Sequence, residues 1–275
     1  MMKILMMEGN PLAVREKGRS IGVRTATEIY MEAVRLFDAD IEIDIINGAD
    51  GDKLPQGLNF SDYSGMIISG SSLRAFEDKP EVTLQIEILK EFSETGKPIL
   101  GSCWGLQIAA IAAGGEVCAS PNGREIGIAR KISLTKAGIE HPFMANKPHF
   151  FDAPCIHYDE VSILPDSATL LCSNDHSVVQ GAIIPLGKSE VWGVQYHPEF
   201  DLGHLIMLYG FYKNDLLEQG FVNNEEEYHR LVESMKTLAL YPDNKAIAWQ
   251  LNIDEDILST QIRAIEIANW LRHLQ

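Results

Sequence analysis

Positive charge, cysteine and long apolar runs are all scarce in this chain of 275 residues. Lys and Arg number 23 against 39 Asp and Glu, which gives a formal net charge of −16. That balance disfavours nucleic acid and anionic membranes as partners, and we attribute it to solubility. No apolar run approaches the length of a transmembrane helix, and the run at 4–7 stops at Glu8, too short for a secretory signal. We therefore expect a cytoplasmic protein that binds neither nucleic acid nor membrane.

Cysteines are few and are not arranged as a metal site. The four are Cys103, Cys118, Cys155 and Cys172, with no Cys-x-x-Cys pair and no zinc-like spacing with histidine. Without a secretory signal, disulfides are not expected. The sequence predicts reduced thiols. Cys118, Cys155 and Cys172 are expected to be small core residues, whereas Cys103 is a candidate nucleophile.

Cys103 stands in a sequence that presents a nucleophile. The apolar residues before Gly101 predict a short buried strand, and the run Gly-Ser-Cys-Trp-Gly at 101–105 predicts a sharp turn into a helix. This pattern is the thiol version of a nucleophile elbow. Glycines allow the tight turn, and the helix start favours the thiolate that nucleophilic attack requires. A structural thiol at a helix start is the alternative, and it leaves the flanking glycines unexplained.

A histidine and a carboxylate follow 94 residues later. The run at 191–194 predicts a strand that ends near His197, and Pro198 keeps that histidine extended. Residues two apart in an extended segment share a face, so Glu199 can orient the imidazole while the other ring nitrogen serves Cys103. Nucleophile, base and orienting carboxylate form the logic of a catalytic triad.

Four sequence blocks in order resemble the class I glutamine amidotransferases. They are the elbow with Gln107, the His-Pro-Glu at 197–199, the strand and loop at 65–71, and the segment at 156–161, which resembles the His-Gly-Asp-x-Val of the GMP-synthetase-like branch. They span roughly residues 3–200. The resemblance implies a flavodoxin-like α/β fold, with a mostly parallel sheet covered by helices on both faces. Ligands in such sheets bind at the carboxyl ends of the strands.

The resemblance also assigns roles around the nucleophile. It implies an oxyanion hole from the backbone of Gly70, Ser71 and Trp104, and substrate-binding roles for Gly105, Gln107 and His157. Two segments depart from the family pattern: Ser71 and Ser72 stand where Gly-Pro is usual, and Tyr158 replaces a common glycine. A backbone N–H does not depend on its side chain, so the first departure need not abolish the oxyanion hole, but it leaves open which N–H points at the oxyanion. For His157, a packed, hydrogen-bonded histidine is the alternative.

Strand-like and helix-like segments alternate over the first 115 residues, which predicts a parallel sheet. We expect strands at 3–7, 41–46, 66–68 and 99–100, helices at about 25–37, at 80–95 and from the elbow to 114–115, and a long loop from Glu8 to about Thr25. Shorter β-like segments at 126–134, 160–163, 169–172, 178–184 and 191–195 predict an antiparallel addition and the last core strand. Ser173–His176 is expected to form an Asx turn, with substrate contact as the alternative.

Residues 203–275 are predicted to be helical and to extend beyond a domain at 1–202. A cap at Asn224 precedes an apolar stripe, and a second stripe contains Ile267, Trp270, Leu271 and Leu274. Such stripes usually pack on the domain they follow. The alternatives are a homodimer or partner interface, or a lid.

The loop after the first strand carries a small basic cluster. Its members are Arg15, Lys17, Arg19 and Arg24. At the carboxyl edge of the sheet, this cluster would lie near the site and could meet an anionic acceptor. A solvated loop is the alternative.

We expect hydrolysis of the glutamine side-chain amide through a γ-glutamyl thioester on Cys103, with ammonia released for an unidentified acceptor, such as a separate synthetase. No metal or cofactor is needed for that chemistry. One alternative is a γ-glutamyl peptide hydrolase of the same fold, and another is a degenerate amidotransferase that binds or regulates a partner. A cysteine hydrolase of the intracellular-protease type would place histidine directly after the cysteine, where this chain has Trp104.

Overall fold

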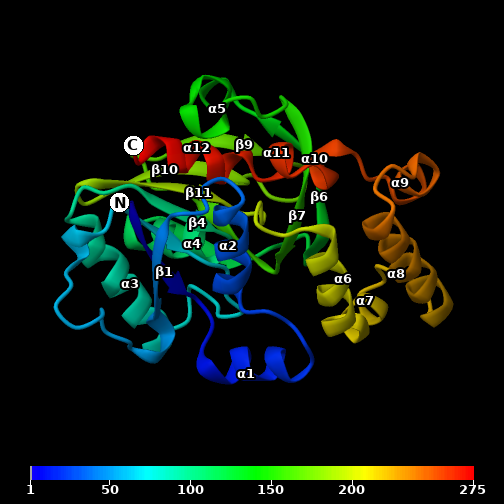
Figure 1. The fold of residues 1–275 in the computed structure, drawn as a ribbon, viewed down its shortest axis with the longest axis horizontal. Helices are drawn as coiled ribbons and strands as arrows, with labels where there is room; N and C mark the ends of the chain where they lie inside the picture. The colour runs from blue at the N-terminus through cyan, green and yellow to red at the C-terminus, as the bar shows by residue number, and fades with distance from the viewer. Residues whose placement is uncertain (1) are drawn as a thin grey trace.

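A nine-stranded sheet in the order β2-β1-β3-β4-β11-β10-β9-β6-β7 forms the frame of the computed structural model, which describes residues 2–275 (Figure 1). The first five strands in that order are parallel, and the other four are antiparallel to their neighbours. A second sheet pairs β5 with β8. The strands are β1 (Lys3–Glu8), β2 (Glu42–Asn47), β3 (Gly65–Ile68), β4 (Ile99–Ser102), β5 (Glu116–Ala119), β6 (Glu125–Leu134), β7 (Phe150–His157), β8 (Asp159–Ile163), β9 (Thr169–Ser173), β10 (Gly181–Leu186) and β11 (Ser189–Val194).

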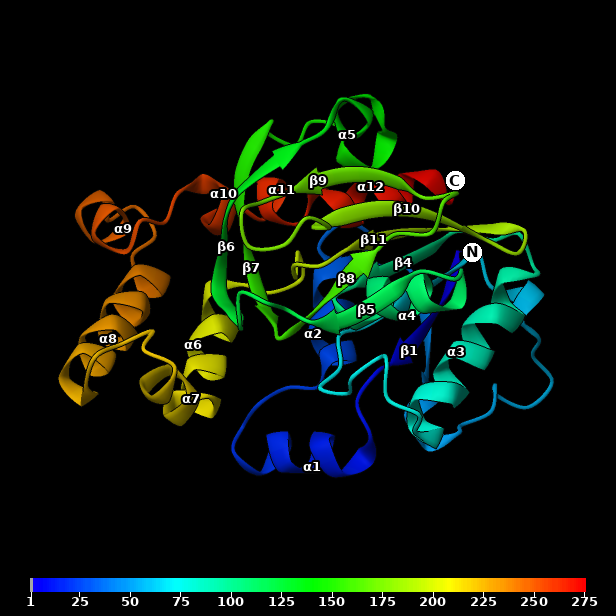
Figure 2. The same ribbon diagram turned by 180° about the vertical axis from the view of Figure 1, so that it is seen from behind.

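Helices cover both faces of the parallel half, as expected. Figure 2 shows α3 and α4 in front of the sheet, and α2 and α12 lie behind it. No helix within residues 2–275 has both the length and the apolarity to cross a membrane. The helices are α1 (Leu12–Ser20), α2 (Ala26–Arg35), α3 (Pro80–Ser93), α4 (Trp104–Ala112), α5 (Lys136–Glu140), α6 (Leu202–Phe211), α7 (Lys213–Glu218), α8 (Glu225–Leu240), α9 (Lys245–Leu251), α10 (Glu255–Leu258), α11 (Thr260–Arg263) and α12 (Ile265–His273).

The alternation of side chains along β1 explains the two core layers. Ile4 and Met6 belong to the apolar cluster that contains residues of α2 and α12, whereas Leu5 and Met7 belong to the cluster that contains residues of α3 and α4. A strand with apolar residues on both faces must be covered on both faces. Because β1, β3, β4 and β11 are parallel neighbours, their carboxyl ends lie along one edge of the sheet.

Several elements differ from the expectations, among them α1, α5, β5 and β7. The segment expected as a loop contains α1, whose sequence is mostly polar and begins without a side-chain cap, so it shows little helical periodicity. The strands β5 and β7 were not expected from the sequence. Within β7, Pro154 interrupts the strand pattern, and it is tolerated because β7 is the edge strand of the sheet.

All four thiols are free within residues 2–275. Cys155 and Cys172 are buried in the core, as predicted, and burial raises the pKa of both thiols well above the ordinary value. The same prediction was wrong for Cys118, which is only half-buried on the short strand β5. The two core thiols are therefore protonated and unreactive.

The last helix is part of the core. As predicted, Ile267, Trp270 and Leu271 are buried, and a Cβ on Gly65 of β3 would lie 2.8 Å from the Trp270 ring. Lys147 Nζ lies 2.9 Å from a Glu266 carboxylate oxygen, with both side chains fully buried. The same ammonium donates to the carbonyls of Ile262 and Arg263. The C-terminal segment thus closes over the sheet, and its division from residues 1–202 stays a prediction.

Loss of the buried ammonium should destabilise the whole fold. Lys147→Ala leaves the Glu266 carboxylate buried without its partner, and we expect the free energy of unfolding to fall by about 3–5 kcal/mol. Urea unfolding followed by tryptophan fluorescence measures the change. The control is Lys188→Ala, which removes an exposed ion pair with Glu94 and should cost less than about 1 kcal/mol. Equal effects of the two variants would contradict a structural role for the buried pair.

Candidate active site

Cys103 is held in a strained turn between β4 and α4. Its φ is 50° and its ψ is −97°, in a region that side-chain-bearing residues rarely adopt. The Cys103 N–H donates to the Val194 carbonyl at 2.7 Å, which fixes the turn to the end of β11. A Cβ on Gly101 would lie 2.7 Å from the Gly105 carbonyl carbon, and one on Gly105 would lie 2.9 Å from the Ile68 carbonyl oxygen. The glycines therefore permit the close approach that the predicted elbow requires.

His197 and Glu199 form the predicted pair. The His197 Nδ1 lies 2.7 Å from Glu199 Oε1, to which it donates. Ser102, the neighbour of the nucleophile, also donates from its hydroxyl to the same carboxylate oxygen at 3.1 Å. The other ring nitrogen of His197, Nε2, has no hydrogen-bond partner among the described residues. His197 and Cys103 line the same cavity. Cys103 and His197 thus line one cavity, with Glu199 hydrogen-bonded to the far side of the imidazole, and their roles as nucleophile, base and orienting acid stay a prediction.

The imidazole of His197 is clamped on two sides. Phe200 stacks on its face, with ring centroids 4.0 Å apart and planes 2° from parallel, and His204 packs behind Phe200. On another side, a Cβ on Gly70 would lie 2.7 Å from the imidazole Cε1. The ring therefore has little freedom to turn away from the thiol.

The electrostatic surroundings favour a charged imidazole. Burial alone would lower the pKa of His197, but the Glu199 carboxylate and the Cys103 sulfur outweigh it and raise the pKa to about 10. At neutral pH the imidazolium therefore persists beside the sulfur, and a positive neighbour stabilises a thiolate.

The loop expected to bind the oxyanion is braced from behind. The Gly9 N–H donates to Ser69 Oγ at 3.0 Å, and the Ser71 hydroxyl donates to the Gly9 carbonyl at 2.8 Å. The Trp104 indole donates to Gln85 Oε1 at 2.8 Å, which holds the start of α4. Trp104 is the first residue of α4, and an N–H at that position has no partner within the helix. The backbone of Trp104 and of the loop thus remains available to an oxyanion, a role that stays a prediction.

The predicted substrate-binding residues divide into two kinds. Gln107 and His157 line the cavity above Cys103. Gly105 packs against β3 and is absent from the lining. Gln107 donates from Nε2 to the Asp159 carbonyl at 2.8 Å, and the His157 Nδ1 lies 3.2 Å from the same carbonyl.

His157 is fully hydrogen-bonded inside the protein, as the alternative reading expected. Its Nε2 lies 2.8 Å from a Glu125 oxygen, and that carboxylate also accepts from Asn174 and Gln180. Burial opposes the ionised carboxylate of Glu125, but these donors outweigh it and lower its pKa. The Asn174 side chain accepts from the N–H groups of His176 and Ser177, which confirms the Asx turn.

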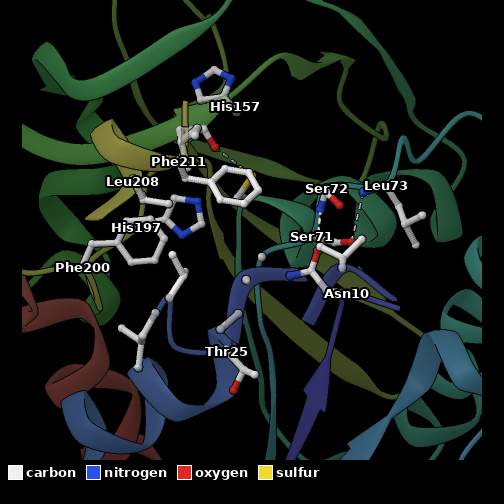
Figure 3. Close-up of a pocket in the computed structure, with 18 of the residues that line it drawn as sticks. Asn10, Thr25, Ser71, Ser72, Leu73, His157, His197, Phe200, Leu208 and Phe211 are labelled. Atoms are coloured by element: carbon white, nitrogen blue, oxygen red, sulfur yellow. Dashed lines mark hydrogen bonds between the residues drawn. The ribbon is translucent and has the colours of Figure 1, made fainter. Parts of the chain in front are cut away.

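A cavity of about 530 Å³ opens above the nucleophile (Figure 3). Its walls come from α1, the start of α2, the loop after β3, the end of β7 and α6. Two of the basic residues singled out in the sequence, Arg15 and Arg24, line it, but they pair with Asp50 and Glu32. Arg15 and Arg24 are therefore paired with carboxylates of this chain. The helix α1, which carries Arg15, Lys17 and Arg19, takes the place of the expected loop.

Sequence reasoning missed the residues that surround the triad. Phe200 directly follows the His-Pro-Glu motif, and Ser102 directly precedes the nucleophile, so proximity in the chain could have indicated both. The apolar wall formed by Leu208 and Phe211 could not be found in this way, because its place depends on how α6 turns back over the sheet.

The fold and these contacts are those of an α/β enzyme that hydrolyses amides with a cysteine nucleophile. A family model described as Glutamine amidotransferase class-I matches residues 25–211. The chain therefore belongs to the class I glutamine amidotransferases, as the four sequence blocks predicted.

Related proteins of two kinds are similar to this chain. A Gamma-glutamyl-L-1-hydroxyisopropylamide hydrolase from Pseudomonas sp is 30% identical over 99% of this chain and 93% of its own length. Gamma-glutamyl peptidase 4 from Arabidopsis thaliana is 31% identical over 60% of this chain and 65% of that protein. The crystal structure of a glutamine amidotransferase from Thermotoga maritima covers 99% of this chain and 97% of its own, with a TM-score of 0.69 at 19% identity. That last likeness concerns the fold.

Removal of the orienting carboxylate should lower the reactivity of Cys103. In Glu199→Gln the His197 pKa falls because the negative charge beside Nδ1 is lost. We expect alkylation by iodoacetamide at pH 7 to slow, because a less stable imidazolium stabilises a neighbouring thiolate less. In the pH profile of that rate, the step that belongs to His197 should move to lower pH. A profile identical to that of the parent protein would contradict the triad.

A methyl group at Gly70 should displace the imidazole. Gly70→Ala places a Cβ against a ring that Phe200 and Glu199 hold, so we expect kcat to fall by about 10²-fold or more, since small misplacements near the chemistry have such costs. The control is Gly210→Ala on α6, where an added Cβ meets nothing within 4 Å, and that variant should keep full activity. Full activity in both would show that the imidazole is not held as described.

Proposed function

We propose that this enzyme hydrolyses γ-glutamyl amides and that its leaving group is an organic amine. The observation that carries the proposal is the cavity that extends from Cys103 to α1 and α6, well beyond the volume that an ammonia leaving group needs. The similarity to a Gamma-glutamyl-L-1-hydroxyisopropylamide hydrolase over nearly the whole chain supports the same reading.

The acylation step uses the triad and the braced loop. The Cys103 thiolate attacks the δ-carbonyl carbon, and the carbonyl oxygen takes the negative charge. Backbone N–H groups of Trp104, Gly70 and Ser71 stabilise that oxyanion, a contribution of about 10²–10³ in rate for a single donor. The imidazolium of His197 gives its proton to the amide nitrogen as the C–N bond breaks. The amine departs, and a γ-glutamyl thioester remains on the sulfur.

The deacylation step reverses the role of the imidazole. Neutral His197 takes a proton from water, and the hydroxide attacks the thioester carbon. The C–S bond breaks, glutamate leaves, and the thiolate is restored beside the imidazolium. Gln107 and the segment at 157–159 provide the wall against which the γ-glutamyl group is held.

Delivery of ammonia to a separate synthetase is the second candidate. The observation behind it is the likeness to a GMP synthase [glutamine-hydrolyzing] from Enterobacter sp. (strain 638), 33% identical over 50% of this chain and 25% of that protein. This candidate requires glutamine to be the preferred substrate.

A substrate panel with the purified chain separates the two candidates. We expect glutamate release from γ-glutamyl alkylamides to exceed release from glutamine by at least tenfold in kcat/KM. Cys103→Ser should lower every rate by about 10⁴-fold or more, as loss of a nucleophile does in triad enzymes. Trapping of a γ-glutamyl thioester by mass spectrometry after acid quench identifies the acylated residue. A preference for glutamine would favour the ammonia-delivering function instead.

A further inference from the structure

The position of the general acid decides where the leaving amine emerges. His197 must lie within hydrogen-bond reach of the departing nitrogen, whereas the oxyanion must face the backbone of the loop after β3. Figure 3 shows these two sides apart: Ser71 lies across the cavity from His197, which Phe200, Leu208 and Phe211 accompany. The substituent on the amine therefore enters the part of the cavity that α6 lines.

That part of the cavity is apolar. Phe200, Leu208 and Phe211 line it from α6 and the residues before it, and Val23 and Ile29 line it from the segment around the start of α2. A hydrocarbon substituent placed there is removed from water, which stabilises the bound state in proportion to the area buried.

The wall beside His197 also carries no charge of its own. Burial, reinforced by the positive charge of Arg24, lowers the pKa of His204 to about 3, so this histidine is neutral. The arginines that line the cavity each pair with a carboxylate of the chain, which compensates their charge. The pairs are Arg15–Asp50, Arg24–Glu32, Arg74–Asp159 and Arg124–Asp215.

Contacts outside the cavity fix the apolar wall in place. Asp201 caps α6 by accepting from the His204 N–H at 2.7 Å. Gly127, at φ 90°, leaves room for Tyr209, whose hydroxyl would lie 1.9 Å from a Cβ at that position. The Lys17 ammonium of α1 lies 5.4 Å from the Phe211 ring centroid. The wall is therefore a built surface that α1 meets from the opposite side.

We propose that this wall is a leaving-group subsite that selects neutral, apolar amines, with Leu208 and Phe211 as the specificity-determining residues. The inference rests on the proposed function and names its substrate class: γ-glutamyl amides of small alkylamines, in preference to γ-glutamyl amino acids and to glutamine.

A matched set of substrates tests the subsite. γ-Glutamyl isopropylamide and γ-glutamylalanine differ only by a methyl group in place of a carboxylate, and γ-glutamyl methylamide lacks two carbons of the first. We expect kcat/KM to rise about fourfold per added carbon from methylamide to isopropylamide. We expect γ-glutamylalanine to fall at least tenfold below the isopropylamide. Each kcat/KM value is obtained from glutamate release measured under the same conditions.

Variants of the wall tie the preference to its residues. Phe211→Ala and Leu208→Ala should each lower the ratio of isopropylamide to methylamide by about fivefold or more. Phe211→Trp, which fills the subsite, should lower the isopropylamide rate and spare the methylamide. The control is Leu240→Ala, which removes an exposed leucine of α8 outside the cavity and should leave the ratio unchanged. Circular dichroism and the alkylation rate of Cys103 verify that each variant is folded with a reactive site.

Two results would overturn the inference. The first is a flat substrate series, or a preference for γ-glutamylalanine, in an enzyme that does hydrolyse γ-glutamyl amides. The second is a ratio that does not respond to Phe211→Ala or Leu208→Ala in folded variants. Absence of any γ-glutamyl amide hydrolysis would instead remove the proposed function, and the two failures are thereby distinguished.

Discussion

The hydrogen bond from the Cys103 N–H to the Val194 carbonyl is the contact on which the site depends. It joins the turn after β4 to the end of β11, two parallel neighbours separated by nearly 90 residues of chain. Because the register pairs Ser102 with Val194, the nucleophile lies at the end of one strand and His197 lies three residues beyond the end of the other. The strained backbone of Cys103 is tolerated because this bond and the close glycine contacts leave no other path for the chain.

The C-terminal helices contribute to the site as well as to the fold. Glu266 of α12 pairs with Lys147 in the core and accepts from the Tyr196 hydroxyl, which precedes His197 directly. At the other end of the segment, α6 lines the cavity, so a helix assigned by sequence to an extension belongs to the site. The extension therefore supports the base from one side and shapes the cavity from the other, which is more than the covering of apolar surface that its stripes alone indicate.

The sequence was informative where a residue's function follows from its immediate neighbours. Cys103 between glycines, and His197 followed by Pro198 and Glu199, indicated the two segments that the fold brings to one cavity as a candidate triad. The alternation of strands and helices predicted the parallel sheet. The helix α1 and the edge strand β7 were not predicted, because a polar helix and a strand with an internal proline have weak periodic patterns. The resemblance gave the backbone positions of the oxyanion loop. It could not give the partners of His157, which are the Glu125 carboxylate of β6 and the Asp159 carbonyl of β8.

The contact between Phe200 and His197 connects the proposed catalysis to the proposed selectivity. Phe200 stacks on the imidazole that protonates the departing nitrogen in the proposed reaction, and it lines the same cavity. In that reaction, an apolar substituent packed against Phe200 holds the departing nitrogen within reach of the imidazolium and excludes water from both. An ammonia leaving group has no substituent with which to do this. Positioning of the nitrogen against its acid acts on the proton-transfer step, so the proposal implies a preference in kcat as well as in KM.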